Sequence, residues 1–241
     1  MKELTAQTVA DIVTENIKTA NVFKKYGIDF CCGGGVSIDK VCQEKKIDPK
    51  LLEQELLAVT QEKNRDHDYN SWKLDFLINY IINVHHSYVV KAVPQILQYS
   101  NKVAEVHGDL HPEVIKINDL FHHVANELRA HMSKEEELLF PYIIELVKAR
   151  SNKESAQPPS FGTVRNPIQM MITEHENVGE SLRIFDKLSN NYTPPESACN
   201  TYRALYANLS EFEQDLHLHI HLENNILFPK AVKLEQDLLS Q

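Results

Sequence analysis

Two stretches of the sequence follow one template, and this repetition constrains the fold more than any other feature. They read HMSKEEELLFP at 131–141 and HIHLENNILFP at 219–229. Each begins with a histidine, has a glutamate four residues later and ends in Leu-Phe-Pro. An interior histidine precedes each stretch at a similar distance, since His86 lies 45 residues before His131 and His175 lies 44 residues before His219. We interpret the pattern as a duplicated pair of helices, which predicts a bundle with a pseudo-twofold site at its centre.

The spacing within each stretch predicts which side chains face inward. Residues four apart on a helix lie on one face, with about 5 to 6 Å between their Cβ atoms, so the histidine and glutamate of each stretch point in one direction. Both belong to stripes of apolar residues that step by three and four positions, and so does His175. The three stripes are Val124, Leu128, His131, Glu135 and Leu138; Ile168, Met171, His175, Val178 and Leu182; and Leu205, Leu209, Phe212, Leu216, His219, Glu223 and Ile226. We therefore expect four histidines and two glutamates inside an apolar core.

Six such groups need partners when they are buried. An unpaired polar group costs several kcal/mol on burial, and the apolar stripes offer nothing else to pair with them. The donor set is all nitrogen and oxygen, which suits iron or manganese and gives a structural zinc site little support. Six ligands are too many for one ion with an open position. We therefore predict two iron ions, each held by two histidines and both bridged by the two carboxylates, with room for an oxo or hydroxo bridge. The expected ligands are His86, His131, Glu135, His175, His219 and Glu223.

The remaining histidines are expected to lie outside the metal site. His85 and His86 each continue an apolar stripe, so periodicity leaves the choice between them open, and the spacing to His131 favours His86. His217 and His221 lie about 200° around the helix from His219, where we expect solvent. Five further histidines have no matching partner and are interpreted as surface residues or outer contacts of the site: His67, His107, His111, His122 and His123.

The chain as a whole favours an all-α fold with two domains. Gly and Pro are few, at 7 and 10 of 241 residues, and long segments have a helical period. A small helical domain that contains cysteines is expected at 1–65. It would hold one helix from Thr8 as N-cap to Gly27, a short helix over 36–46, and a third that begins at Asp48-Pro49 and ends in the linker-like run QEKNRDHD.

A four-helix bundle is expected at 66–241. Its long helices are predicted over 72–105, 112–150, 167–190 and 195–236, with Asn166-Pro167 opening the third and Thr193-Pro194 preceding the fourth. The breaker-rich segment 151–165 joins the second helix to the third.

Composition excludes several classes of protein. The formal net charge is -9, and no segment clusters Lys and Arg, so we expect no nucleic-acid binding. No N-terminal apolar run has the form of a leader, and no uncharged stretch is long enough to cross a bilayer, so we expect a cytoplasmic protein with no membrane contact. Four cysteines, two of them adjacent, suit a reducing compartment better than a disulfide-linked scaffold.

The adjacent cysteines belong to the sequence CCGGG at 31–35, where one expected helix has ended and the next begins. Glycines allow positive φ and expose amide N–H groups near a helix start, which predicts a stabilised thiolate and a lowered thiol pKa. Adjacent cysteines suit a strained disulfide or thiol exchange, and suit joint binding of one ion poorly. The alternative is a structural turn with small buried thiols. Cys42 and Cys199 are expected to be ordinary buried or partly buried residues.

Four motifs give the chain a resemblance to one known family, and this resemblance covers about residues 5–235. With FKKYGIDFCCGG, HMSKEEELLFP, TEHENVGE and HLENNILFP it resembles the di-iron iron–sulfur cluster repair proteins, in which a small cysteine-containing domain precedes a hemerythrin-like up-down four-helix bundle. The resemblance implies the same six ligands and supports His86 over His85. It also marks Glu127 and Glu174 near the metals, where they would balance charge or form a hydrophilic path for ions. Solvated surface positions are the alternative for both. It favours a role for Cys31 and Cys32 as redox thiols, in electron or iron handling at the mouth of the bundle.

The function implied by the resemblance is the repair of iron–sulfur clusters damaged by nitrosative or oxidative stress, by supplying iron to damaged proteins. Nitric oxide or oxygen is the expected small ligand, an electron donor of unknown identity is implied, and the small N-terminal domain offers a surface for a homodimer. Two alternatives stay open: reduction of nitric oxide at the two irons, and a carrier or sensor that binds oxygen or nitric oxide reversibly. The thiols argue against a simple carrier, because a carrier needs no redox groups.

Overall fold

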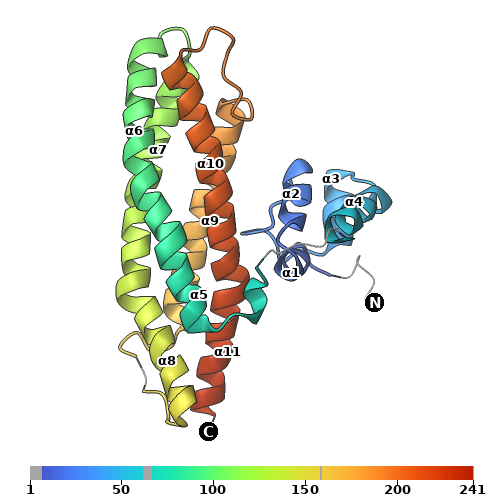
Figure 1. Cartoon of the computed structure of the whole chain (residues 1–241), viewed down its shortest axis with the longest axis vertical. Coiled ribbons are helices and arrows are strands. Elements are labelled where there is room, and N and C mark those ends of the chain that lie inside the picture. The colour runs from blue at the N-terminus through green and yellow to red at the C-terminus, as the bar shows by residue number, and fades with distance from the viewer. Residues whose placement is uncertain (1–6, 62–66, 158, 241) are drawn as a thin grey trace.

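The computed structural model describes residues 7–61, 67–157 and 159–240, which form helices joined by turns and loops (Figure 1). The first four helices gather beside the flank of a long bundle, and the chain then runs up and down through that bundle (Figure 1). Within the described ranges, no helix combines the length and the apolar character needed to cross a membrane. The expected domain boundary near residue 65 falls in 62–66, outside the described residues.

The N-terminal region consists of α1 (Val9–Glu15), α2 (Thr19–Lys25), α3 (Ile38–Lys45) and α4 (Pro49–Gln61). Thr8 caps α1 as expected: its hydroxyl accepts a hydrogen bond from the Asp11 amide, and the Asp11 carboxylate accepts one from the Thr8 amide. Gly27 follows α2 with a φ of 60°, a conformation that favours glycine after a helix. Both ends of the segment expected to be helical are therefore placed correctly.

The prediction of a single helix between those ends is wrong, because the chain leaves the helical conformation at Asn16. This residue is extended, with φ -151° and ψ 105°, and its side-chain oxygen accepts a hydrogen bond from the Lys18 amide at 3.1 Å. An asparagine that bonds the backbone two residues further on offers the chain an alternative to the helical hydrogen bond. Two short helices, α1 and α2, therefore replace the one expected, and they pack on each other.

Four long helical rods follow a short 3-10 turn, η2 (Tyr69–Ser71). The first is α5 (Leu74–Tyr80), η3 (Ile81–His86) and α6 (Ser87–His107). The second is α7 (Pro112–Lys134), η4 (Glu135–Leu139) and α8 (Phe140–Asn152). The third is α9 (Arg165–Leu188), and the fourth is α10 (Asn200–Leu222), η5 (Glu223–Leu227) and α11 (Phe228–Leu239).

These rods form an up-down four-helix bundle. α6 packs on α7, α7 on α9, α9 on α10 and α10 on α6, so each rod contacts the next and the ring closes. The first three rods match their predicted ranges closely. The fourth begins at Asn200 and not at residue 195, because residues 195–198 form a separate turn in which the Ala198 amide bonds the Pro195 carbonyl at 2.9 Å.

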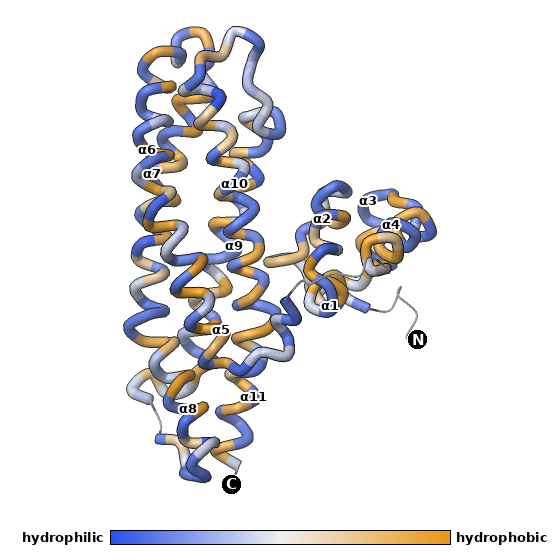
Figure 2. The backbone as a smooth tube through the Cα atoms, viewed as in Figure 1, coloured by the Kyte–Doolittle hydropathy of each residue, from blue (hydrophilic) through white to orange (hydrophobic). Residues whose placement is uncertain are grey.

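The apolar core of the bundle is divided in two along its length. One cluster extends from Val89 to Val103 on α6 and includes Phe121 and Phe212, together with apolar residues of α1–α4. The other cluster includes Leu77, Phe140 and other residues toward the opposite end of the bundle. Figure 2 shows hydrophobic and hydrophilic residues alternating along every rod. The predicted metal ligands belong to neither cluster, and they lie between the two along each rod.

Candidate metal centre

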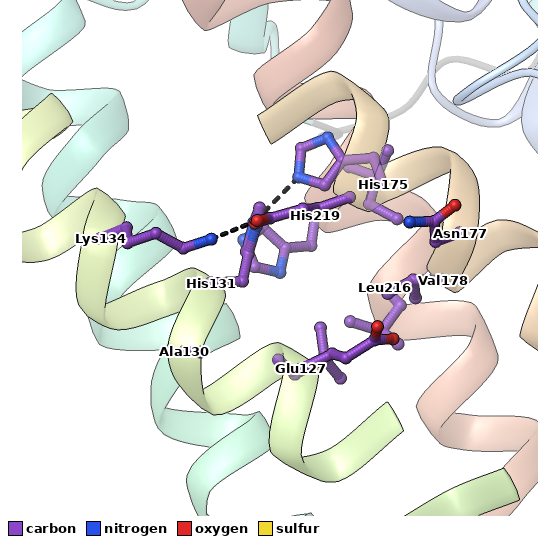
Figure 3. Close-up of a pocket in the computed structure, with 12 residues that line it drawn as sticks. Glu127, Ala130, His131, Lys134, His175, Asn177, Val178, Leu216 and His219 are labelled. Atoms are coloured by element: carbon purple, nitrogen blue, oxygen red, sulfur yellow. Dashed lines mark hydrogen bonds and ion pairs between the residues drawn. The ribbon is translucent and has the colours of Figure 1, made fainter. Parts of the chain in front are cut away.

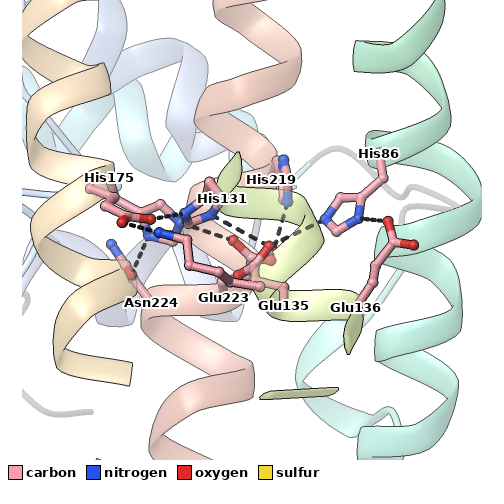
Figure 4. A network of polar contacts seen from close by, with 10 residues as sticks. His86, His131, Glu135, Glu136, His175, His219, Glu223 and Asn224 are labelled. Atoms are coloured by element: carbon pink, nitrogen blue, oxygen red, sulfur yellow. Dashed lines mark hydrogen bonds and ion pairs between the residues drawn. The ribbon is translucent and has the colours of Figure 1, made fainter. Parts of the chain in front are cut away.

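All six predicted ligands are buried, and each of the four rods contributes at least one of them. His86 ends η3, His131 lies on α7, His175 on α9 and His219 on α10, while Glu135 and Glu223 begin η4 and η5. None is more than 3 % exposed, and both glutamates are fully buried. Figure 4 shows their side chains converging between the rods. The structure therefore brings together the side chains that the repeat predicted to face inward.

The ligand atoms form two groups that share the two glutamates. One group is His86, His219, Glu135 and Glu223, and the other is His131, His175, Glu135 and Glu223; in each, the ligand atoms lie within 4.8 Å of one another. His86 Nε2 and His131 Nε2 each lie 3.4 Å from Glu135 Oε2. His175 Nε2 lies 3.2 Å from Glu223 Oε2, and His219 Nε2 lies 3.1 Å from Glu223 Oε1. Each glutamate thus reaches one histidine of either group.

A local widening of the helix places each glutamate. Between Glu135 and Leu139, and again between Glu223 and Leu227, the helix makes a π turn in which the next amide, at Phe140 or Phe228, bonds the glutamate carbonyl. A proline follows directly in both repeats. Because proline has no N–H and its ring clashes with the carbonyl four residues earlier, the regular helical pattern cannot continue unchanged through it. Such π turns are frequent at functional sites.

The π turns also change which apolar residues face the core. Leu138, expected on the buried stripe, is 43 % exposed, whereas Leu139 is fully buried. The expectation for Leu138 is wrong because the extra residue of the π turn rotates everything after it by about 100° relative to a regular helix. The third π turn, η3, explains why the two stripes through His85 and His86 looked equally good, since both histidines are buried.

We call the six buried candidate ligands the ligand layer. Three of its histidines also have a hydrogen bond at Nδ1 to a residue outside this layer. His86 Nδ1 lies 2.7 Å from Glu136 Oε1. His131 Nδ1 lies 2.8 Å from Glu174 Oε2, and His175 Nδ1 lies 2.8 Å from Asn224 Oδ1. Such contacts orient an imidazole and make it a better ligand.

Glu136 and Asn224 were not predicted from the sequence, although the repeat contains the signal. Both residues directly follow the candidate glutamate ligand of their stretch, and each bonds the upstream histidine of its own half of the bundle. Comparing the two stretches position by position would have marked them.

The charges of the layer shift the pKa values of its members. Burial opposes protonation of His86 and His175, but neighbouring carboxylates outweigh it and raise the pKa of each to about 9. Burial dominates at His219 and lowers its pKa. Burial opposes ionisation of Glu223, but the histidines around it hold its pKa well below the usual range. Without a cation, the layer therefore holds protons in place of positive metal charge.

The donor set fits iron. It is all nitrogen and oxygen, it divides into two groups of four with shared carboxylates, and it lies in an apolar bundle. Despite the short distances between these ligand atoms, several buried inward-facing atoms form no hydrogen bond among the described residues: His86 Nε2, both carboxylate oxygens of Glu135, and Glu223 Oε2. Buried polar atoms of this kind normally have partners, and a cation between the two glutamates would provide one.

A cavity of about 140 Å³ opens beside the ligand layer. Figure 3 shows His131, His175 and His219 on one side of it and Glu127 on another. Glu174 also lines the cavity and is paired with Lys134. Burial opposes ionisation of Glu174, but Lys134 and His131 outweigh it and lower its pKa. The two acidic residues marked by the resemblance therefore lie on the wall of the same cavity, and Glu174 also contacts a ligand.

One histidine that was expected at the surface lies in the interior. His221 is 1 % exposed because the N-terminal region covers it: Phe30 packs against its ring edge, and Asn225 Nδ2 lies 3.0 Å from its Nδ1. Burial lowers the pKa of His221 to about 4. The expectation of solvent at His221 is therefore wrong, and at His217, which is half-buried beside Phe30, it is only partly right.

His85 is also buried and lies beside the ligand layer. Its ring stacks on that of His219, with centroids 5.4 Å apart and an interplanar angle of 13°. Its Nδ1 lies 2.9 Å from Asp215 Oδ1. The five histidines interpreted as surface residues or outer contacts belong to neither group of ligand atoms.

The cysteine loop lies against the bundle next to a candidate ligand. The Cys32 thiol donates to the His175 carbonyl at 3.4 Å, and Cys31 Sγ lies 3.8 Å from Cys32 Sγ. The Asn224 amide, which accepts from His175, donates to the Cys31 carbonyl at 3.5 Å. Asp29 closes the loop by accepting from the amides of both cysteines at 3.0 Å. The thiols are free and form, with Asp29, a third group of potential metal ligands.

Two expectations for this loop are wrong. The pKa of Cys31 is raised well above the usual range, because its thiol donates a hydrogen bond to Cys32, is buried, and lies beside the Asp29 carboxylate. Asp29 also accepts from the two cysteine amides, so these do not point at a thiolate. Its glycines also do not adopt positive φ. Gly34 is needed for close packing, since a Cβ there would lie 2.4 Å from the Phe30 carbonyl oxygen. Cys42 is buried as expected, whereas Cys199 is exposed.

Comparison with known families matches both parts of the chain. Residues 5–60 match a domain of unknown function, DUF542, and residues 77–231 match the hemerythrin HHE cation binding domain. Fold and site together define the chain as a cation-binding helical bundle of the hemerythrin type.

Several relatives match nearly the whole chain. The iron-sulfur cluster repair protein ScdA of Staphylococcus haemolyticus is 34% identical over 222 residues, covering 92% of this chain and 96% of the relative. The iron-sulfur cluster repair protein YtfE of Yersinia pseudotuberculosis serotype O:1b is 35% identical over 218 residues, covering 90% and 93%. A probable iron-sulfur cluster repair protein of Haemophilus influenzae is 32% identical over 228 residues, covering 94% and 96%. The chain belongs to this family of iron–sulfur cluster repair proteins.

Proposed function

We propose that this chain repairs damaged iron–sulfur clusters by supplying iron from a pair of sites formed by His86, His131, Glu135, His175, His219 and Glu223. The observation that carries the proposal is the buried layer of donors, in which two groups of four ligands share both glutamates. Relatives at 32 to 35% identity are named for the repair itself. Bound there, iron would supply both the cargo for repair and an exchangeable ferric/ferrous couple.

The residues around the layer suit release as well as binding. Glu127 and Glu174 line the cavity beside the ligands, so a cation that leaves through this cavity would pass two carboxylates. Lys134 pairs with Glu174 and competes with a cation for the same carboxylate. This competition would favour onward movement over a second stable site in the cavity.

We further propose that Cys31 and Cys32 handle electrons or iron beside the ligand layer. The support is their position: Cys32 contacts the His175 backbone, and Asn224 joins the cysteine loop to the His175 ring. Both thiols are free, so they are available for exchange or for binding a cation together with Asp29.

The proposal includes the setting that the resemblance implies. It places the protein in the cytoplasm during nitrosative or oxidative stress, with nitric oxide or oxygen as the small ligand, an electron donor still to be identified, and oxo- or hydroxo-bridged irons. It also divides the chain into a cysteine-containing domain at 1–65 and a bundle at 66–241, with homodimer contacts through the former.

One experiment tests the proposed function directly. The iron-loaded protein is mixed anaerobically with an enzyme whose iron–sulfur cluster has been damaged by nitric oxide, and the iron content of both proteins is measured alongside recovered activity. We expect iron to move from this chain to the target as activity returns. The matched controls are the metal-free protein with and without an equal amount of free iron. Recovery without loss of iron from this chain would refute iron supply, and consumption of nitric oxide with a reductant but no recovery would favour a reductase.

A further inference from the structure

One of the four histidine ligands lacks the support that the other three have. His86, His131 and His175 each have Nδ1 within 2.8 Å of a side-chain oxygen on another helix. His219 Nδ1 is buried and has no hydrogen-bond partner anywhere in the described residues. Its ring is stacked on His85, which holds the plane of the ring but accepts no hydrogen from it.

The missing contact has a consequence for metal binding. A group that accepts a hydrogen bond from Nδ1 increases the electron density at Nε2 and fixes the orientation of the ring. Loss of such a contact typically costs about 10- to 100-fold in metal affinity. His219 therefore offers a weaker and less firmly oriented Nε2 than the other three histidines.

The two ligand groups are unequal for this reason. Both glutamates belong to both groups, so they do not distinguish them. In the group with His131 and His175, both histidines are supported at Nδ1, one of them by a charged carboxylate. In the group with His86 and His219, only His86 is supported.

We infer that the metal ion held by His86 and His219 is bound more weakly than the ion held by His131 and His175, and that it is the ion released first. This inference rests on the proposed function, since it identifies which part of the site supplies the iron. Release of a ferrous ion breaks its bonds to two imidazoles and two carboxylates, and it needs no oxidant or reductant when the receiving chelator binds ferrous iron.

Comparison of the two halves shows which residues account for the different support of His131 and His219. Glu174 directly precedes His175, and His85 directly precedes His86. Glu174 accepts from His131, but His85 stacks on His219 and is bonded at its own Nδ1 to Asp215. The half that has a carboxylate before its histidine supports a histidine of the other half, His131, whereas the half with an imidazole there gives His219 no such support.

This comparison suggests a substitution that should repair the weaker position. In His85→Gln, the amide oxygen could accept from His219 Nδ1 while the amide nitrogen donates to Asp215, so both buried groups would be satisfied. The reciprocal variant, Glu174→Ala, removes the acceptor from His131. The matched control is His122→Gln, which makes the same exchange at an exposed position on α7, where His122 Nε2 lies 3.0 Å from Asn101 Oδ1.

The test measures iron release from the full-length protein. Protein loaded anaerobically with two Fe²⁺ per chain is mixed with a ferrous chelator, and chelated iron is followed with time. We expect two phases of equal size whose rates differ by about tenfold or more. His85→Gln should slow the fast phase toward the slow one, Glu174→Ala should speed the slow phase toward the fast one, and His122→Gln should change neither.

Crystals of half-depleted protein then identify the ion that remains. We expect anomalous scattering from iron between His131 and His175 and little between His86 and His219. The opposite occupancy, a single release phase, or variants that leave both rates unchanged would overturn the inference. If His85→Gln does not fold, Glu174→Ala and the crystals decide it. A protein that cannot be loaded with two ions contradicts the proposed centre itself, so the two failures are distinguishable.

Discussion

Metal loading should release about two protons from histidine at pH 7 and about half as many at pH 9. In the metal-free protein the pKa values of His86 and His175 are both about 9, so at pH 7 each imidazole is neutral in only about one molecule in a hundred. A metal ion binds only the neutral imidazole, so each of these two protons must leave on loading.

The same numbers give the effect on affinity. A pKa two units above the working pH costs about 2.7 kcal/mol per histidine, at about 1.36 kcal/mol per unit. For two histidines the overall constant for loading two ions should therefore rise by up to about 10⁴-fold between pH 7 and pH 9, and level off above that. The direction follows from the raised pKa values, because the metal competes with protons that the glutamates hold in place.

Calorimetric titration with Co²⁺ measures the proton count. The observed enthalpy is plotted against the ionisation enthalpy of several buffers, at pH 7 and at pH 9, and the slope gives the protons released. Glu136→Gln should reduce the count for His86 near pH 9, because Glu136 helps to raise its pKa, whereas Glu137→Gln, at the exposed neighbouring position, should not. Fewer than one proton at pH 7, or a count that fails to fall at pH 9, would refute the reasoning.

Stability of the metal-free protein should follow the opposite trend. A histidine whose folded pKa is raised stabilises the fold fully below the unfolded pKa of about 6.5, and this stabilisation is lost as the pH rises through about 9. Urea unfolding of the metal-free protein should therefore show a lower midpoint at pH 9 than at pH 6.5. A midpoint that stays constant or rises over this range would contradict the assigned pKa values.

Three further predictions test other parts of the structure. Leu139→Ala should cost about 2 to 5 kcal/mol in urea unfolding, whereas Leu138→Ala should change stability by less than about 0.5 kcal/mol, and the reverse order would refute the π turn. Gly34→Ala should destabilise the N-terminal helices by about 1 to 3 kcal/mol, because the new methyl overlaps a backbone carbonyl, and proteolysis of α1–α4 should report it while the bundle resists. Replacing Cys31 and Cys32 with serine should leave iron content unchanged and reduce cluster repair, so full repair by this variant would make the pair merely structural.

Much of the candidate site could be predicted because the same histidine and glutamate spacing occurs twice in the sequence. The all-α bundle follows from long amphipathic segments, and the six buried candidate ligands follow from two copies of one motif with matching upstream histidines. A periodicity of 3.6 residues assumes a regular helix, so it could not predict the π turns that exchange Leu138 for Leu139.

The features that could not be predicted from the sequence depend on contacts between segments that are far apart in the chain. His221 has the polar environment of a surface residue along its own helix, and it becomes buried only because Phe30 packs on it from the N-terminal region. The raised pKa of Cys31 likewise depends on its hydrogen bond to Cys32, on burial, and on the nearby charge of Asp29, which also accepts from the amides of the loop. The glycine-rich composition of the loop predicted amides that face the thiol, but these amides donate to the carboxylate of Asp29, two residues before Cys31.

The shared glutamates explain how such a site could give up one ion and keep its fold. Glu135 and Glu223 belong to both ligand groups, so both carboxylates would remain available to an ion held by His131 and His175 after its neighbour had left. A buried carboxylate without a partner is costly, and the layer lies between two apolar clusters that offer none. Departure of the ion at His86 and His219 therefore leaves only two imidazoles unbound, and of these His86 can take a proton shared with Glu136. Loss of the second ion would leave protonated histidines as the positive charge beside both glutamates, so the shared carboxylates favour release of one ion over release of two.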